Sequence, residues 1–294
     1  MIVIDWLDAN LITIVDGIAF GLLLFTLAVG LSLVFGMMDV LNLAHGTLYL
    51  AGAYLAYQLS DGSWLGLLLA LLAALVVGLV SGAALAALTQ PLANRGHLDQ
   101  ALLTLGVAFI VSDFFMAAYG GEVLPASPPN ALAGSMHLVG HTYPVYRLVF
   151  IGVAGALAAL VALAIERGSL GALVRATVAD RDTVRTLGVD TRKVLLGVFA
   201  FGATLAALGG VLGAPILAPG PGVDERVLVL SLVIVVIGGL GSVRGALLGA
   251  LFVGQVQSLG IALLPEFAPF LLFGVMFAVL TIRPHGLSPM ERRT

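Results

Sequence analysis

Long apolar runs are the feature that most restricts how this chain of 294 residues can fold. A helix needs about 20 apolar residues to cross the hydrocarbon core of a membrane. Only 10% of the residues are charged, too few to cover a soluble protein of this length. Apolar runs of this kind fall at 11–36, 43–59, 64–90, 98–120, 144–165, 194–218, 227–240, 245–264 and 268–283. They predict an all-α polytopic membrane protein with about eight or nine transmembrane spans, forming a single integral membrane domain over residues 1–294.

Composition excludes several classes of function. Thirteen basic residues stand against sixteen acidic ones, so the chain offers no cationic surface for nucleic acid. The sequence has no cysteine, no P-loop, no metalloprotease helix and no nucleophile elbow. We therefore expect no enzyme active site, no cofactor and no ATP site in this chain. His137 and His141 stand four apart in a proline-rich segment without a third ligand, which favours two solvated loop histidines over a metal site.

The basic residues indicate which side faces the cytoplasm, because cytoplasmic loops are enriched in arginine and lysine. With segment 166–193 placed in the cytoplasm, Arg147 and Arg226 are the two basic residues on the outer side. The inner side carries Arg95, Arg167, Arg175, Arg181, Arg185, Arg192, Lys193, Arg244, Arg283, Arg292 and Arg293. The outer side carries the acidic residues Asp5, Asp8, Asp61, Glu122, Asp224, Glu225 and Glu266. We expect an external N-terminus and a cytoplasmic C-terminus.

Two segments are expected outside the membrane. Residues 121–143 are rich in proline and small residues, which predicts an extracytoplasmic loop rather than a helix. Residues 166–193 form the most polar stretch, in which Leu170, Leu173, Val174, Thr177 and Val178 recur at helical spacing. Gly188 fits a helix stop. A solvated connector would not need such an apolar stripe, so the pattern favours an amphipathic helix over 171–187 that enters a groove of a partner.

Two glycine-containing segments interrupt the apolar runs at comparable places in the two halves of the chain. In 36–46 the interrupting side chains are Asp39, Asn42 and His45, and in 238–245 four glycines stand beside Ser242 and Arg244. Paired broken segments of this kind point to the substrate site of transporters built from inverted repeats. The alternative is two ordinary turns at the membrane interface. Glycines four apart elsewhere, such as Gly17/Gly21 and Gly78/Gly82, are expected to serve helix packing.

Asp16 and Asp113 are the ionisable residues inside predicted spans. An acid in the membrane is a functional candidate, because an unpaired charge is costly there. A secondary transporter or channel that works without ATP would need one of these acids for ion coupling, and this class stays open as an alternative. A third possibility is a structural or assembly subunit that transports nothing.

Three landmarks together resemble one family. They are Gly30-Leu-Ser-Leu-Val-Phe-Gly-Met-Met-Asp-Val-Leu-Asn-Leu-Ala-His-Gly46 followed by Tyr49, Gly52, Ala53 and Tyr54; Gly171, Arg175-Ala176, Asp180-Arg181-Asp182 and Leu187-Gly188-Val189-Asp190; and Gly238-Gly-Leu-Gly-Ser-Val-Arg-Gly-Ala-Leu-Leu-Gly249. In this order, over about residues 12–285, they resemble branched-chain amino acid ABC transporter permeases of the H-subunit type. Segment 227–233 lacks the lysine and phenylalanine that members often carry before the double glycine. Relatives that resemble importers of urea, short amides or aromatic acids share the same landmarks, so the substrate stays open within this class.

The resemblance implies a permease subunit of a bacterial ABC importer in the inner membrane, which works by alternating access. Its implied partners are a second homologous permease, two ATP-binding cassette ATPase subunits and a periplasmic substrate-binding protein that docks on the acidic face. By position, the ATPase-coupling residues are Arg175, Asp180, Arg181, Asp182, Arg185 and Gly188. The residues of the substrate pathway are Asn42, His45, Gly46, Gly239, Gly241 and Ser242, although His45 fits equally well as a brace for the broken helix.

Overall fold

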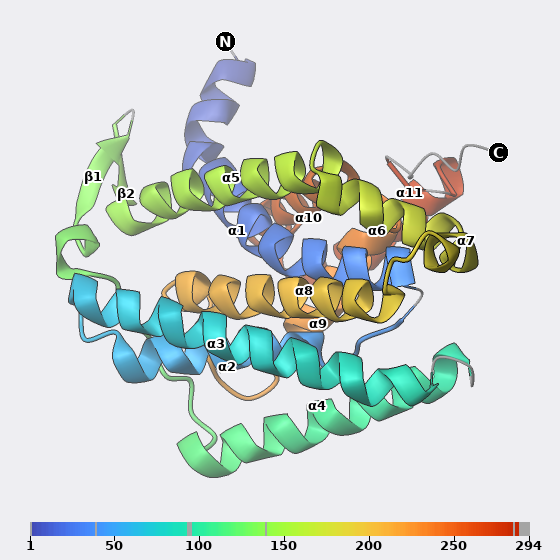
Figure 1. Ribbon diagram of the computed structural model, residues 1–294. Helices are drawn as coiled ribbons and strands as arrows, with labels where there is room; N and C mark the ends of the chain where they lie inside the picture. The colour runs from blue at the N-terminus through green and yellow to red at the C-terminus, as the bar shows by residue number, and fades with distance from the viewer. Residues whose placement is uncertain (1, 39, 93–95, 139, 285, 288–294) are drawn as a thin grey trace.

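The protein is a bundle of helices with one small β-hairpin (Figure 1). The computed structural model describes residues 2–38, 40–92, 96–138, 140–284 and 286–287. Among the charged residues named above, Asp39, Arg95, Arg292 and Arg293 lie outside these ranges. Some side chains within the helices also lie outside the described part, namely those of Asp5, Asp8, Leu170, Val178, Arg181 and Asp182.

Six helices of the described chain are long and apolar enough to cross a membrane. They are α1 (Ile2–Met38), α3 (Trp64–Thr89), α4 (His97–Tyr119), α5 (Val145–Glu166), α8 (Thr191–Gly213) and α10 (Val243–Leu263). Three further apolar helices are shorter: α2 (His45–Leu59), α9 (Val223–Gly238) and α11 (Ala268–Ile282). Each of the nine predicted apolar runs therefore contains a helix, and the helical membrane class is confirmed. The number of spans stays a prediction, because α2 and α9 are too short to cross a bilayer alone.

The long helices run side by side between two ends of the molecule (Figure 1). At one end lies the hairpin of β1 (Ser135–Leu138) and β2 (His141–Pro144), and we call this the hairpin end. At the opposite end lies α7 (Arg181–Thr186), which follows α6 (Ser169–Ala179), and we call this the α7 end. Short 3₁₀ turns complete the chain: η1 (Gln90–Leu92), η2 (Asn130–Leu132) and η3 (Pro265–Phe267).

The segment predicted as a loop, 121–143, contains most of the hairpin. The strands are antiparallel, with His137 opposite Thr142 and Leu138 opposite His141. Since neighbouring residues of a strand point to opposite faces, the side chains of the two histidines lie on opposite faces of the hairpin, and not on one face of a helix. The loop is held to its surroundings by backbone bonds, in which Leu124 N–H donates to Pro219 (2.9 Å) and Asn130 N–H donates to Gly62 (2.8 Å).

Helix α1 forms the centre of the core. Every residue from Gly21 to Val34 is buried, and α1 packs against α5, α8, α9 and α10. The outer faces of α3, α4 and α11 instead expose large apolar side chains, including Leu68, Phe114 and Phe277. A soluble protein of this size would bury such faces, whereas lipid tails are a compatible solvent for them.

Small residues let the central helices approach closely, as their spacing predicts. A Cβ at Gly78 or Gly82 of α3 would overlap the α8 backbone at Thr204 or Ala200. On α1, a Cβ at Gly21 would overlap the α10 backbone at Ala250. The packing role predicted for these glycines is confirmed, and it fixes α1 and α8 as the inner pair that the outer helices surround.

Candidate functional site

The first break in the helices runs from the end of α1 into the first residues of α2, and we define it as residues 40–46. Asn42 is 2% exposed, and its Oδ1 atom accepts a hydrogen bond from the N–H of Ala44 at 3.1 Å. Its backbone carbonyl accepts a hydrogen bond from the N–H of His45 at 3.3 Å. Asparagine is suited to this turn, because its short amide can replace a backbone partner. Asn42 therefore shapes the entry to α2.

A threonine on α4 anchors the first break from outside. The Oγ1 atom of Thr104 donates to the carbonyl of Leu41 at 3.1 Å and accepts from the N–H of Leu43 at 3.0 Å. Backbone groups outside a helix are tolerated within the membrane only where protein or water hydrogen-bonds them, and here one hydroxyl group bonds two backbone groups. The sequence pattern did not predict Thr104, because a lone threonine in an apolar run gives no signal for a contact 61 residues away.

His45 and Gly46 place the start of α2 deep in the bundle. The Nε2 atom of His45 donates to the carbonyl of Leu27 at 2.9 Å, so the imidazole carries its proton on Nε2. The ring is 1% exposed. A Cβ at Gly46 would overlap the backbone oxygen of Asp224 at the start of α9. The first turns of the two short helices therefore lie against each other.

The second break, residues 239–242, joins α9 to α10 and is built mainly from backbone. Gly239 (φ 100°) and Gly241 (φ 75°) adopt left-handed conformations that disfavour other residues. The N–H of Gly241 donates to the Oγ atom of Ser32 on α1 at 3.2 Å. Ser242 caps α10, because its Oγ atom accepts a hydrogen bond from the N–H of Gly245 at 3.0 Å.

The two breaks form two separate sites along α1. The first contacts α1 at Leu27 through His45, and the second contacts α1 at Ser32 and lies against Gly36. Along the helix axis, Ser32 and Gly36 lie about 7 and 13 Å from Leu27. The structure thus groups Asn42, His45 and Gly46 in one place, groups Gly239, Gly241 and Ser242 in another, and does not bring the six together.

We call residues 166–190, which join α5 to α8 at the α7 end, the connector. It contains two helices, so the single helix predicted over 171–187 is wrong. Asp180 ends the first part, and its Oδ1 atom accepts from the N–H of Thr183 at 2.9 Å, which caps α7. An aspartate N-cap of this kind starts a new helix instead of continuing the old one. The predicted stop is confirmed: α7 ends at Thr186, and Gly188 has a φ of 84°.

The apolar stripe of the connector packs on this chain and not in an open groove. Val174, Thr177 and Val184 are buried, so among the described side chains the stripe is already covered. Arg175 is also used internally, because its Nη1 atom donates to the carbonyl of Ile165 at the end of α5 (2.6 Å). The exposed residues of the connector include Arg185 and Leu187, the latter 76% exposed.

An ion pair joins the connector to the second break. The Nη2 and Nε atoms of Arg244 lie 2.7 and 2.8 Å from the Oε2 atom of Glu166. Glu166 is the last residue of α5, where the connector begins, and Arg244 lies two residues beyond Ser242. The ion pair could therefore transmit a movement of the connector to the start of α10.

The two acids that the sequence places inside spans have different surroundings. Asp16 of α1 pairs with Arg147 of α5 and accepts a hydrogen bond from Tyr143 of β2 at 2.7 Å. Burial, together with the neighbouring Asp16 carboxylate, raises the pKa of Tyr143 above its ordinary value, so this hydroxyl stays a donor. Asp113 is exposed on α4. Asp16 therefore links α1 to α5 through Arg147 and to the hairpin through Tyr143.

Asp224 departs from its predicted place on the outer acidic face. It is 5% exposed, in the first turn of α9, and its Oδ1 atom is buried without a hydrogen-bond partner in the described chain. The helix begins after Gly222, whose φ of 76° turns the chain inward. In the sequence, Gly220-Pro221-Gly222 followed by an apolar run could have indicated that a helix starts here. This pattern does not indicate how deeply the first turn is buried.

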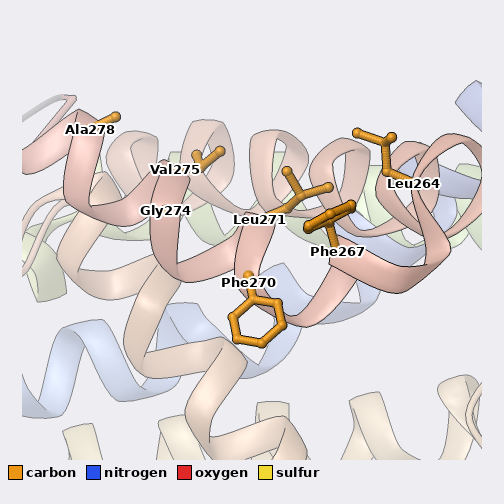
Figure 2. Close-up of a pocket in the computed structure, with 7 residues that line it drawn as sticks. All are labelled: Leu264, Phe267, Phe270, Leu271, Gly274, Val275 and Ala278. Carbon is orange, nitrogen blue, oxygen red and sulfur yellow. The ribbon is translucent and has the colours of Figure 1, made fainter.

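A hollow on the outer face of α11 is entirely apolar. It has a volume of about 320 Å³ and is lined by Leu264, Phe267, Phe270, Leu271, Gly274, Val275 and Ala278 (Figure 2). These residues follow one another along η3 and α11, as Figure 2 shows. It offers no side-chain group that could hold a charged ligand, so its surface suits a lipid chain. In the part of the chain that the structure describes, no group of three histidine, aspartate or glutamate side chains could hold a metal ion.

Comparison with known proteins matches the chain to one family over nearly its whole length. Residues 13–280 match the family described as the permease component of the branched-chain amino acid transport system. The chain is 25% identical to the high-affinity branched-chain amino acid transport permease BraD of Pseudomonas aeruginosa, covering 93% of this chain and 94% of the relative.

Two Escherichia coli relatives extend the comparison. Similarity to the permease LivH is 25% identity over 92% of this chain and 93% of LivH. Similarity to the permease LivM is 27% identity over 90% of this chain and 68% of LivM. No solved structure matches the chain.

Proposed function

The chain belongs to the family of permease components of branched-chain amino acid transport systems, and from this premise we propose that it is the transmembrane subunit of a bacterial ABC importer. It moves branched-chain or related amino acids inward by ATP-driven alternating access and performs no covalent chemistry. The observation that carries the mechanism is the ion pair of Glu166 with Arg244, which links the polar connector to a broken helix in the bundle. The names of BraD and LivH support the substrate class.

The α7 end faces the cytoplasm and the hairpin end faces the periplasm. Arg167, Arg175, Arg185, Arg192 and Lys193 belong to or border the connector, and Arg244 is paired with its first residue, whereas Arg147 pairs with Asp16 beside the hairpin. This distribution agrees with the bias of basic residues toward cytoplasmic loops. The N-terminus is then periplasmic and the C-terminus is cytoplasmic. Together with the six long helices, α2, α9 and α11 make nine spans of the inner membrane as partial or tilted helices, the odd number that termini on opposite sides require.

Two inverted halves make up the bundle, α1–α4 and α8–α11. Helices α3 and α10 start with the same turn, a left-handed glycine, a capping serine and a further glycine: Gly62, Ser63 and Gly66 in one case and Gly241, Ser242 and Gly245 in the other. Helix α3 packs along α8, and α10 packs along α1, which is the reciprocal arrangement that an inverted repeat produces. Each half contributes one short helix, α2 or α9.

The connector receives the movement of the ATPases. Its coupling residues are Arg175, Asp180, Arg181, Asp182, Arg185 and Gly188. Arg175 fixes α6 to the end of α5, Asp180 sets the angle of α7, and the outward-facing Arg185 is available to a partner. A push on α7 passes through α6 to Glu166 and from there to Arg244 at the second break.

The two breaks act as joints of the pathway, with Asn42, His45 and Gly46 in the first and Gly239, Gly241 and Ser242 in the second. Their backbone groups are held by single hydrogen bonds from other helices, and such bonds can exchange partners when the helices move. A second permease completes the pathway, as the similarity to both LivH and LivM supports. Two ATPase subunits and a periplasmic binding protein complete the importer, and the binding protein docks on the hairpin end.

The test is uptake of radiolabelled L-leucine by right-side-out vesicles that contain the assembled transporter. The expected result is uptake that requires ATP and stops when the ATPase subunits are removed. Uptake that persists without ATPases and follows an ion gradient would instead establish the secondary-transporter alternative. Competition by urea, acetamide or benzoate would redirect the substrate assignment to the corresponding relatives.

A second test concerns docking. Replacing Arg181, Asp182 and Arg185 with alanine should abolish co-purification of the ATPase and leave insertion in the membrane unchanged. Arg192→Ala, which removes an exposed charge at the start of α8, is the matched control and should retain the ATPase. Retention of the ATPase by the triple variant would refute the docking assignment.

A further inference from the structure

A carboxylate oxygen with no hydrogen-bond partner in the described chain lies in the interior of the bundle. Asp224 is 5% exposed and its Oδ1 atom has no hydrogen-bond partner in the described chain. Its backbone packs on Gly46, next to His45, whose ring bonds the Leu27 carbonyl inside the span Ala9–Gly36. Burying a carboxylate oxygen without a partner is unfavourable, and an acid within the membrane part of a bundle is a candidate for a ligand or ion path.

The start of α9 does not need this acid for its own stability. Acidic residues in the first turn of a helix favour the positive end of its dipole. Glu225 occupies the same turn and is exposed on the surface of the bundle, so it supplies this effect without burial. The burial of Asp224 therefore calls for another explanation.

An aromatic cluster lies on the same short helix that packs against Asp224. The first turn of α2 meets the backbone of Asp224 at Gly46, and further along α2 Tyr54 stacks on Phe115 and Tyr119 of α4, with ring centroids 4.9 and 4.3 Å apart. Aromatic faces attract cations, and they also provide apolar contact area. A buried carboxylate on α9 and a set of rings on the neighbouring α2 and α4 match an ammonium group that carries an apolar chain.

A second unpartnered polar atom continues the same face of α9. Ser231 lies seven residues after Asp224, which is two turns along the helix, and it is fully buried with no hydrogen-bond partner for its hydroxyl in the described chain. Leu228, between them on this face, lies next to Gly46 of α2. The two free polar atoms thus follow the side of α9 that faces α2.

We propose that Asp224 binds the ammonium group of an apolar amino acid as the substrate passes between α2, α4 and α9, with the rings of Tyr54, Phe115 and Tyr119 receiving the cation and its side chain. Ser231 offers the next polar contact along the path. The proposal rests on the importer function and assigns the group that recognises the substrate within the membrane.

The first experiment compares Asp224→Asn with Glu225→Gln in the assembled transporter in proteoliposomes. Asparagine keeps the size of the side chain and removes its charge. We expect Asp224→Asn to reduce the L-leucine transported per ATP hydrolysed by about tenfold or more, the effect of losing a charge-assisted hydrogen bond. Glu225→Gln, which changes the neighbouring acid in the same turn, should leave the L-leucine transported per ATP hydrolysed unchanged.

The outcomes separate this proposal from the function on which it rests. If the wild-type transporter takes up no L-leucine in the presence of ATP, the proposed function fails. If the wild type transports and Asp224→Asn keeps its transport per ATP, the ammonium site is refuted while the importer function stands. Equal losses in Asp224→Asn and Glu225→Gln would reduce Asp224 to a helix-end charge and would also overturn the site.

A binding measurement on the full-length wild-type chain avoids dependence on a variant that fails to fold. Thermal unfolding in detergent is followed with 3-methylbutylamine, which carries the ammonium group without a carboxylate, and with 4-methylpentanoate, which carries the carboxylate alone. We expect the amine to raise the midpoint of unfolding and the acid to leave it unchanged. Stabilisation by the acid alone, or by neither compound, would contradict the assignment of Asp224.

Discussion

The two breaks in the helices are stabilised by different kinds of interaction. The first is held by side chains, since Asn42, His45 and Thr104 each supply a hydrogen bond to the backbone. The second depends on glycines in left-handed conformations and on one serine cap, and it touches the connector through Arg244. A side-chain network specifies one geometry closely, whereas a glycine turn permits several. The first break is therefore suited to hold the pathway near Asp224, and the second is suited to move with the connector.

The largest effect is expected from adding one methyl group at the first break. Gly46→Ala places a Cβ against the backbone oxygen of Asp224, and neither helix backbone can yield without shifting. We expect the cost to lie at or above the upper end of the range of about 1–3 kcal/mol for overpacking, with loss of transport. The measurement is the amount of protein in the membrane and its unfolding midpoint in detergent.

Gly106→Ala is the matched control, because Gly106 lies within α4 and nothing lies within 4 Å of an added Cβ there. This substitution should be neutral or slightly stabilising. Equal stability of the two alanine variants would show that α2 and α9 do not meet at Gly46.

The next effect concerns the imidazole that fixes α2 to α1. His45→Phe keeps a ring of similar size but removes the donor to the Leu27 carbonyl, so we expect a loss of about 1–3 kcal/mol in the free energy of unfolding. His45→Gln can still donate from its amide and should recover part of that loss. Denaturation of the purified chain measures both. If phenylalanine and glutamine behave alike, the hydrogen bond does not hold this break.

Much of the bundle follows from the sequence, because apolar periodicity and length decide where a helix forms. The helices in all nine apolar runs, the close-packed glycines and the stop at Gly188 are of this kind. The helix break at Asp180 is different. The residue pattern of 171–187 predicts one continuous helix, but the hydrogen bond from the N–H of Thr183 to the Asp180 side chain competes with helix continuation. Only the local geometry decides between the two.

The site residues were harder to predict where a contact joins distant parts of the chain. Asn42, His45 and Ser242 interrupt apolar runs, so composition marks them. Thr104 and Asp224 acquire their roles from helices far away in sequence, and a hydroxyl or a carboxylate near the end of an apolar run is common in ordinary membrane helices. The burial of Asp224 depends on how α2 packs against α9, and the spacing of residues along a single helix does not predict that packing.

The second break should lose transport as well as some stability when one of its glycines is replaced. Gly241→Ala forces a side chain into a left-handed conformation, at a cost of about 1–2 kcal/mol. Gly140→Ala imposes the same strain in the hairpin turn, where φ is 83° and an added Cβ meets nothing within 4 Å. Because Gly241 is buried against Gly36, we expect its variant to lower the unfolding midpoint at least as much as Gly140→Ala, and transport should fall only in Gly241→Ala. A loss of transport in both would attribute the effect to stability alone.

The smallest effect on stability should come from the ion pair between the connector and the second break. Arg244 is largely exposed, so Glu166→Gln should change the free energy of unfolding by less than about 1 kcal/mol. If the pair transmits movement from α5 to α10, as we propose, the same variant should lower the L-leucine transported per ATP hydrolysed while ATP hydrolysis continues. Reversing the pair, with Glu166→Arg and Arg244→Glu together, should restore transport above either single reversal, since the attraction depends on opposite charge and not on which helix carries which sign. If the double reversal is no better than the singles, the two residues do not act through each other, and the second break moves by another contact.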